Sequence, residues 1–417
     1  MLVTLLVVGA LQTSAPADTL VIPVDDAVRR VLAVNPMVAA ATGAVRGPRG
    51  LRAETWWPFP ENPTLEYGRV RRRTGAGTTY DREWALTQEV EIVGQWAWRR
   101  NAATALVRSA EALVDDARRI VALEARRAYA TLAVAERRAA LTDSAAAFAQ
   151  RLAAFARQQF EAGEVNRLEW NAAVLEAARA RSAAERAQAG AAIAAADLGR
   201  LLALPGDSTP RTTSLPAIPP LQWASDSLLL AFARARRPDL RASEALRRSA
   251  DRNVTAARLS FIPNLTLSAF EGREDGTDRL LGFAVGLRIP LFHRQQGSIG
   301  AAEAGRAAAH AELAATERAV QSDVLAAGAR FLRARAAERR FATDVLRAAT
   351  ENVTLTERAL SEGEVSLTDV LVLRTAAVNA QLEYLDVLRD AFAAWFELAA
   401  ALAIEPSDLV ALLGTGD

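Results

Sequence analysis

The sequence contains no cysteine, and this absence excludes several kinds of site at once. The chain can form neither a disulfide nor a thiolate metal centre, and it has no cysteine for lipid attachment. It has only two histidines, His293 and His310, which cannot assemble a multi-histidine site within one chain. We therefore predict no resident metal and expect both imidazoles on the solvated surface.

The sequence also lacks a large excess of charge of either sign. Fifty basic residues, all of them arginine, are interleaved with 49 acidic residues, and the net charge is +1. A nucleic-acid-binding protein would show a basic stripe, so we exclude nucleic acid as a partner. The chain has no glycine-rich phosphate loop and no grouping of residues typical of catalysis. We predict neither an enzyme nor a bound cofactor.

Long hydrophobic runs are absent beyond the N-terminus, although apolar residues make up 51% of the chain. Residues 2–11 are apolar and precede Ala15-Pro16-Ala17, a pattern typical of signal-peptide cleavage, although no arginine lies near Met1. Residues 1–17 are therefore predicted to be a signal peptide. Elsewhere no run approaches the ~18–20 residues of a membrane helix. If this protein crosses a membrane, β-strands must do so.

What the sequence does contain is an internal repeat. Gly163-Glu164-Val165 recurs 200 residues later as Gly363-Glu364-Val365, and Asn35-Pro36 corresponds to Arg237-Pro238. The order of these matches predicts a first repeat over residues 18–203 and a second over 226–403. Residues 204–225 are rich in Pro, Ser and Thr and are predicted to be a linker, and residues 404–417 a C-terminal tail.

Each repeat contains a long stretch without proline in which apolar residues return every seven positions. The first stripe is interrupted only by Arg127, and the second is apolar throughout. The members are Leu106, Leu113, Ile120, Arg127, Val134, Leu141, Phe148 and Phe155, then Leu313, Val320, Ala327, Ala334, Phe341, Ala348 and Leu355. This period is typical of a coiled-coil seam. It predicts helices over residues 95–160 and 295–360, each about 100 Å long.

A glycine-containing turn follows each predicted long helix, at residues 161–164 and 361–364. Glycine suits the left-handed position that ends a helix. Residues 166–202 and 366–402 then have the composition of helices that return antiparallel. Each repeat therefore predicts a very long helical hairpin.

Each repeat also contains a short segment with a period of two. In residues 281–289 every second residue is large and apolar, while small or polar residues lie between them, as in a membrane β-strand. With residues 265–269 it predicts one hairpin within 263–290, and residues 63–72 and 82–90 predict another within 62–91. Five tryptophans beside the first hairpin fit either an interfacial aromatic belt or a core where helices meet the sheet: Trp56, Trp57, Trp84, Trp96 and Trp98.

Two hairpins supply four strands, and four strands cannot close a barrel. Open edges are not tolerated in lipid, and the smallest membrane barrels have about eight strands. If these strands span a membrane, several chains must share one barrel. The run Arg71-Arg72-Arg73 at the end of the first strand is interpreted as an ordinary solvated loop, with an extracellular basic patch as the alternative.

This pattern resembles the TolC-like outer-membrane factor family over essentially the whole mature chain, and most closely its CzcC-like branch, which serves heavy-metal efflux pumps. The segments that carry the resemblance are Asn35-Pro36, residues 61–66, residues 86–91 leading to Arg99-Arg100, and Pro290-Leu291-Phe292 followed by residues 293–297.

The resemblance implies a homotrimer in the outer membrane of a Gram-negative bacterium, embedded in its lipid. Helical hairpins would form a periplasmic α-barrel, and four strands per chain would contribute to a shared 12-stranded β-barrel. As the outer-membrane channel of a tripartite efflux system, the trimer would be a passive duct served by a periplasmic adaptor and an inner-membrane pump of the RND type. Heavy-metal cations would be its cargo.

The resemblance also implies functional residues. The adaptor-contacting tips would be Gly163, Glu164 and Val165 in the first repeat and Gly363, Glu364 and Val365 in the second. Some members carry aspartates at the constriction of the tube, and Asp369 falls at a matching place. A second such aspartate would fall near Val372, where this chain departs from the pattern. An acid at a helix start, stabilised by the helix dipole, explains Asp369 equally well.

Two alternatives remain open at this stage. The same duct would also suit drug efflux or type I protein secretion. A soluble periplasmic coiled-coil scaffold would explain the seven-residue period and the signal peptide, but not the alternation over residues 281–289.

Overall fold

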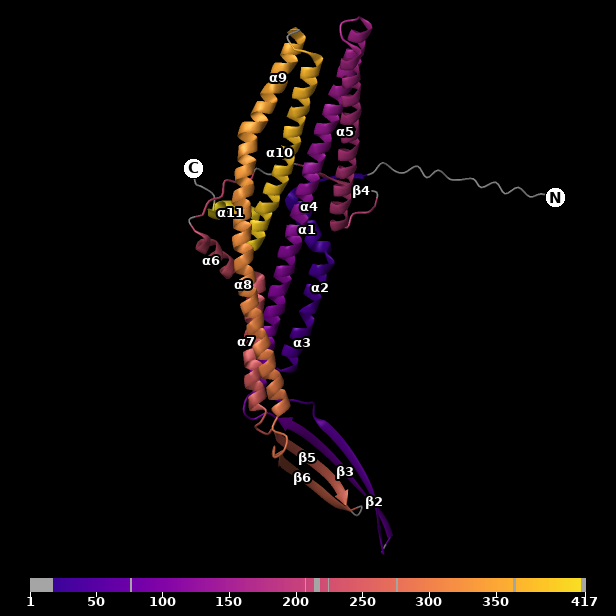
Figure 1. Cartoon of the computed structure of the whole chain (residues 1–417). Coiled ribbons are helices and arrows are strands. Elements are labelled where there is room, and N and C mark those ends of the chain that lie inside the picture. The colour runs from indigo at the N-terminus through magenta and orange to yellow at the C-terminus, as the bar shows by residue number, and fades with distance from the viewer. Residues whose placement is uncertain are drawn as a thin grey trace, which may run out of the picture. The chain divides into compact units, whose positions relative to one another are not determined.

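The computed structural model describes residues 18–75, 77–206, 208–213, 218–223, 225–274, 277–362 and 365–413. Most of these residues are helical, with a minority in strands (Figure 1), so the predicted mostly helical fold with a small β part is confirmed. No described helix is long and apolar enough to cross a membrane. The predicted signal peptide, residues 1–17, lies outside the described residues.

The chain divides into two compact units, and each takes segments from both sequence repeats. Unit 1 comprises Met1–Pro36, Arg118–Leu229 and Val324–Asp417, and unit 2 comprises Met37–Ala117 and Leu230–Asp323. Helices α4 (Gln95–Glu161), α6 (Asp226–Arg236) and α8 (Gln296–Arg340) each contribute residues to both units. The boundaries of the two compact units therefore differ from those of the two sequence repeats.

Unit 2 contains a four-stranded antiparallel sheet with the order β2-β3-β5-β6. Its strands are β2 (Thr64–Thr74), β3 (Gly77–Val90), β5 (Leu265–Glu274) and β6 (Asp278–Leu287). They lie within a few residues of the two predicted hairpins. Pairing of β3 with β5, in a register that runs from Arg82–Arg273 to Val90–Leu265, joins the hairpins into one sheet.

The helices of unit 2 are α2 (Pro36–Ala44), α3 (Arg46–Glu54), α7 (Pro238–Leu259), the second part of α6 and the first parts of α4 and α8. Gln95, at the first turn of α4, is 1% exposed. Its amide nitrogen donates to the carbonyl of Ile262 at 3.3 Å and to Asn264 Oδ1 at 3.4 Å. Because a buried amide needs partners, these bonds fix the start of α4 beside the entry to β5.

Unit 1 contains a two-stranded parallel pair, β1 (Asp18–Ile22) and β4 (Ser208–Thr212). Tyr129 of α4 is fully buried, and its hydroxyl donates to the carbonyl of Ile22 at 3.0 Å. Neither strand was predicted from the sequence. Residues 204–225 were predicted to be a linker, but β4 lies within that segment.

The helices of unit 1 account for most of its residues. They are α1 (Val24–Val34), the remainder of α4 and α8, the start of α6, α5 (Arg167–Leu201), the π-helical turn η1 (Phe341–Val345), α9 (Leu346–Glu362), α10 (Leu367–Leu402) and α11 (Pro406–Leu413). Phe392, Trp395 and Phe396 pack together in the buried second half of α10. Helix α11 lies within residues 404–417, so part of the predicted tail is helical.

Helix α4 begins and ends within about two residues of the predicted bounds 95–160, whereas the segment predicted as one helix over 295–360 consists of α8, the π-helical turn η1 and α9 in succession. The seven-residue stripe of α4 is not a seam buried within this one chain. Within the described helix α4, Val134 is the buried member of the first stripe, while Leu113 is 51% and Phe155 43% exposed. Small residues such as Ala105 and Ala125 form the buried face instead. Alanine allows helices to approach closely, so the bulkier stripe is left facing outward.

Candidate functional site

The first predicted tip is a tight turn between α4 and α5. Gly163 has φ of +82°, a left-handed conformation that favours glycine. Its backbone N–H donates to the carbonyl of Phe160, and the N–H of Glu164 donates to that of Gln159. Asn166 then begins α5 with a capping box, in which its side chain accepts from Glu169 N at 2.9 Å. The turn thus satisfies backbone groups at both helix ends.

The second predicted tip is described only in part, because Gly363 and Glu364 lie outside the described residues. Val365 is half-buried and precedes Ser366, the N-cap of α10. Ser366 Oγ accepts from the N–H of Asp369 at 3.1 Å, and Asp369 Oδ2 accepts from Ser366 Oγ at 2.7 Å. Asp369 is exposed and holds the start of α10, as the helix-start interpretation expected.

Residues next to the two tips pack into one small hydrophobic cluster within unit 1. Leu152 and Ala156 of α4, Ala173 of α5, and Leu367 and Val370 of α10 are its buried members. Trp170, stacked on Phe160 with ring centroids 5.1 Å apart, and the tip residue Val365 pack against it. Apolar burial therefore brings the first hairpin and the start of α10 together.

A groove with a cavity volume of about 380 Å³ lies beside this cluster, between α4, α5 and α10. The Arg374 guanidinium lies 4.6 Å from the ring centroid of Phe148. Thr375 donates to Glu176 at 3.1 Å, which links α10 to α5. Further from the tip, burial and then the charge of Glu338 raise the pKa of Tyr384 above its usual range.

A second candidate surface is one face of the sheet in unit 2. Residues paired across antiparallel strands lie on the same face, so the register identifies which residues of the four strands share one face. Apart from Gln88 and Glu271, its rows nearest the helices are apolar, and the exposed members include Leu65, Tyr67, Trp84, Leu86, Leu267, Leu281, Phe283, Val285 and Leu287. Leu281 and Phe283 are 81% and 85% exposed. At ~3.4 Å per residue, the rows from Leu287 to Leu281 span about 20 Å.

The charged residues on the opposite face of the sheet are predominantly acidic, although Val70, Phe270 and Leu280 also lie on this face. Within the four strands it carries Glu66, Asp81, Glu83, Glu89, Glu274 and Asp278. Arg72 is its one arginine among the described strand residues, and it forms ion pairs with Asp81 and Glu274. The two faces therefore differ in both polarity and charge.

Several of the five tryptophans are exposed. Trp56, Trp57 and Trp84 are each more than half exposed. Arg100 covers the ring of Trp56 at 3.9 Å, and Trp84 packs against Tyr67 with centroids 4.6 Å apart. Their exposure favours the interfacial belt over the core interpretation.

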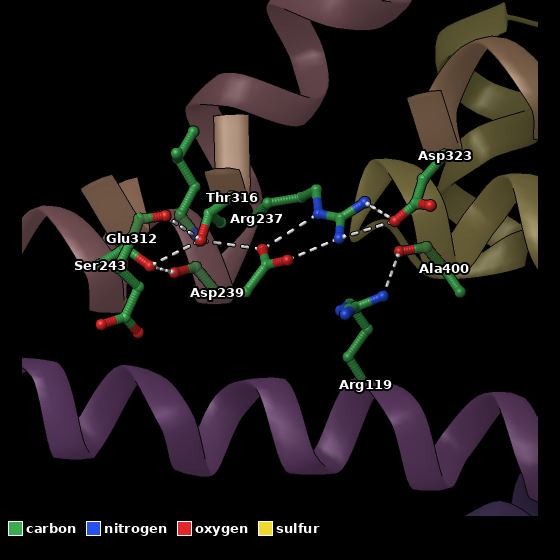
Figure 2. A network of polar contacts seen from close by, with 9 residues as sticks. Arg119, Arg237, Asp239, Ser243, Glu312, Thr316, Asp323 and Ala400 are labelled. Atoms are coloured by element: carbon green, nitrogen blue, oxygen red, sulfur yellow. Dashed lines mark hydrogen bonds and ion pairs between the residues drawn. The ribbon is translucent and has the colours of Figure 1, made fainter. Parts of the chain in front are cut away.

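Unit 2 contains an ion-pair network that was not predicted from the sequence (Figure 2). The Arg237 side chain is 4% exposed and donates to both carboxylate oxygens of Asp239, at 3.0 and 2.5 Å. It also donates to Asp323 Oδ2 of α8 at 3.2 Å. Burial disfavours the charged guanidinium, but the two carboxylates outweigh burial and raise the pKa of Arg237. The network fastens the N-terminus of α7 to α8.

Hydroxyl groups extend this network along α7, as Figure 2 shows. Ser243 Oγ lies 3.1 Å from Thr316 Oγ1 of α8 and donates to the carbonyl of Asp239. Figure 2 also draws Arg119, a residue of unit 1 whose guanidinium donates to the carbonyl of Ala400 at 3.2 Å. Each unit thus has its own polar link between helices distant in sequence.

Among the residues that the structure describes, no three His, Asp or Glu side chains are grouped to hold a metal ion. His293 and His310 are both exposed, as predicted. His310 Nε2 lies 3.1 Å from Asp251 Oδ1.

Comparison with known proteins identifies similar chains. The nickel-cobalt-cadmium resistance protein NccC of Alcaligenes xylosoxydans xylosoxydans is 30% identical over 295 residues, which are 68% of this chain. The chain spans 63% of the length of NccC.

Two solved structures share the fold over almost the whole chain. CusC, described as forming a transmembrane channel, has a TM-score of 0.76 and 19% identity, covering 95% of this chain and 96% of its own. The outer membrane protein VceC of Vibrio cholerae has a TM-score of 0.72 and 18% identity, covering 91% of this chain and 95% of its own.

The model of the family described as outer membrane efflux protein matches residues 59–204 and 229–403. These residues include both strand hairpins, both long helical hairpins and, apart from Asn35-Pro36, the segments that carried the resemblance to the TolC-like family. The chain belongs to the outer membrane efflux protein family.

Proposed function

We propose that this protein is the outer-membrane channel component of a tripartite efflux system, a passive duct that catalyses no reaction. The observation that carries the proposal is the sheet of unit 2. One of its faces is exposed and apolar over about 20 Å, close to the ~25 Å apolar band of outer-membrane strands. A soluble scaffold would gain nothing from such a face.

The two sheet edges support assembly into a homotrimer. β2 and β6 each pair with one neighbour in the described chain, and an unpaired strand edge is costly in lipid because its N–H and C=O groups lack water. Three copies joined edge to edge would form a closed barrel of twelve strands. The outward stripe of α4, including Leu113 and Ile120, would give the helical part apolar contacts between subunits.

We propose the two helical tips as the adaptor contact, with an RND-type inner-membrane pump beyond the adaptor. The tip at Gly163, Glu164 and Val165 is a compact turn stabilised by the capping box of Asn166, so it presents a defined shape. The tip at Gly363, Glu364 and Val365 would act in the same way. The two structural repeats, residues 18–203 and 226–403, would each supply one tip.

Heavy-metal cations are the cargo we propose. The acidic face of the sheet would line the channel, and rings of Asp and Glu favour cations in pores. The relative NccC, named for nickel, cobalt and cadmium resistance, supports the same cargo.

We propose that the three Asp369 side chains of a trimer form a ring of carboxylates at the constriction. We expect Asp369→Asn to lower the cation selectivity of the channel in planar bilayers because three negative charges leave the pore. The amide oxygen of asparagine can still accept from the N–H of Ser366 in the capping box, so α10 should remain stable. The matched control is Glu169→Gln, the corresponding capping-box residue of α5. Unchanged conductance and selectivity in Asp369→Asn would leave the carboxylate with a capping role alone.

Membrane fractionation followed by mass determination of the detergent-solubilised protein tests the proposed function. We expect a trimer in the outer-membrane fraction, because only a shared barrel removes the edges of β2 and β6. A soluble monomer or dimer would contradict the duct and favour a periplasmic scaffold.

A further inference from the structure

The apolar face of the sheet ends in a row of four arginines. Arg69, Arg82, Arg273 and Arg279 are successive cross-strand partners on β2, β3, β5 and β6. We call these four residues the arginine row. It follows directly after the row that contains Tyr67, Trp84 and Leu281, and Arg71 and Arg73 of β2 continue the same face toward the hairpin turn.

Like charges placed directly opposite one another on a sheet are destabilising, so this row needs compensation. Glu271 is the one carboxylate on this face among the described strand residues, and it forms an ion pair with Arg279 at 2.6 Å. Arg69 lies 4.5 Å from the ring centroid of Tyr80. Within the described residues, Arg82 and Arg273 form no ion pair although acids are abundant on the other face. The uncompensated charge points to an external anion.

The position of the row indicates what kind of anion. All four connections to helices leave the sheet at the end near Val90, Leu265 and Leu287, whereas both hairpin turns lie at the end beyond the row. If the apolar rows lie in hydrocarbon, as the proposed function requires, the aromatic row lies at the interface and the arginines lie one step further out. At this level lipid head groups carry their phosphates.

We propose that the arginine row binds the phosphate groups of membrane lipids at the outer rim of the barrel. Guanidinium groups bind phosphate with paired N–H donors, which makes arginine suited to this contact. Neighbouring strands are ~4.8 Å apart, so four adjacent arginines span about 14 Å. A lipid whose head carries two phosphates contacts several members of the row at once and is the preferred occupant. In the proposed trimer each chain supplies one such row.

The test uses the full-length protein in a neutral detergent, with diphosphorylated lipid A as the probe and native mass spectrometry as the measurement. The variant is Arg82→Gln with Arg273→Gln, which removes the two unpaired members. Each arginine near an anionic head group contributes about a fivefold factor in affinity, so we expect the double variant to bind lipid A about 25-fold more weakly. The matched control is Arg288→Gln, one residue beyond β6 at the opposite end of the sheet, which should bind as the unchanged protein does.

Two further probes identify the source of the phosphate. Dephosphorylated lipid A should bind the unchanged protein about as weakly as phosphorylated lipid A binds the double variant. Millimolar inorganic phosphate should not displace the lipid, because a free ion lacks the apolar contacts below the row. Equal binding of lipid A by the double variant and the unchanged protein would overturn the proposal, as would full displacement by inorganic phosphate.

Trimer formation and insertion into phosphatidylcholine vesicles separate this proposal from the proposed function. If the unchanged protein and the double variant both insert as trimers but bind lipid A equally, only the arginine row is refuted. If the unchanged protein neither forms trimers nor inserts, the proposed duct fails and the lipid contact fails with it.

Discussion

The Arg237→Met variant is expected to lose about 3 kcal/mol of its free energy of unfolding, because removal of one partner from a buried ion pair leaves uncompensated charge. Arg237 is the buried member of its network, and its guanidinium is shared between Asp239 and Asp323. Methionine keeps an unbranched apolar stem but has none of the N–H donors of the guanidinium. Urea unfolding of the detergent-solubilised protein, followed by helical circular dichroism, measures the loss.

Arg241→Met on the same helix is the matched control. Arg241 is about half exposed and lies 3.4 Å from Asp115, and exposed pairs contribute about 0–1 kcal/mol. The control should therefore unfold close to the unchanged protein. Equal losses of unfolding free energy in the two variants would show that the buried ion pairs of Arg237 stabilise the protein no more than an exposed pair does.

The Phe283→Arg variant is not expected to accumulate as a trimer in the outer membrane. Phe283 lies on the apolar face of β6 and is 85% exposed in the single chain. An arginine in the middle of the lipid-facing band costs about 2–4 kcal/mol in each chain, and a trimer contains three copies. Fractionation and trimer mass provide the measurement.

Ala284→Arg, at the next position of the same strand, is the control for Phe283→Arg. Its side chain lies on the acidic face, where an added arginine meets water and carboxylates. We expect this variant to insert normally and to conduct cations less well. Normal insertion of Phe283→Arg would mean that the apolar face does not contact lipid.

Much of the fold could be predicted from periodicity alone. The alternation over residues 281–289 located β6, and the stretch without proline from residue 95 located α4, because both signals are local. The parallel pair β1–β4 could not be predicted. Residues 208–212 include Pro210 and show no alternation of apolar and polar residues, and their partner strand lies about 190 residues earlier in the chain.

The candidate sites were predicted less completely. The sequence located the glycine turn at Gly163 because a left-handed residue has a compositional signature. It could not pair Arg237 with Asp323, since 86 residues separate them and both residue types are common on solvated helices. The seven-residue stripe on α4 identified a real apolar face but not its partner, because periodicity does not distinguish contacts within a chain from contacts between chains.

The arginine row could not be predicted from the sequence for a related reason. Arg71-Arg72-Arg73 stood out in the sequence as a run, yet Arg72 lies on the opposite face and is paired with carboxylates. Arg82, Arg273 and Arg279 are isolated in the sequence. Only the cross-strand register places them beside Arg69.

The pairing of β1 with β4 has a consequence for the order in which the chain acquires its structure. Strand β1 emerges first during synthesis, but its partner is made only after both α4 and α5 are complete. Contacts between residues distant in sequence form slowly because a long loop must close first. Unit 1 also requires α10 from the second repeat. We therefore expect unit 1 to assemble late, with β1 unpaired until β4 follows it in the chain.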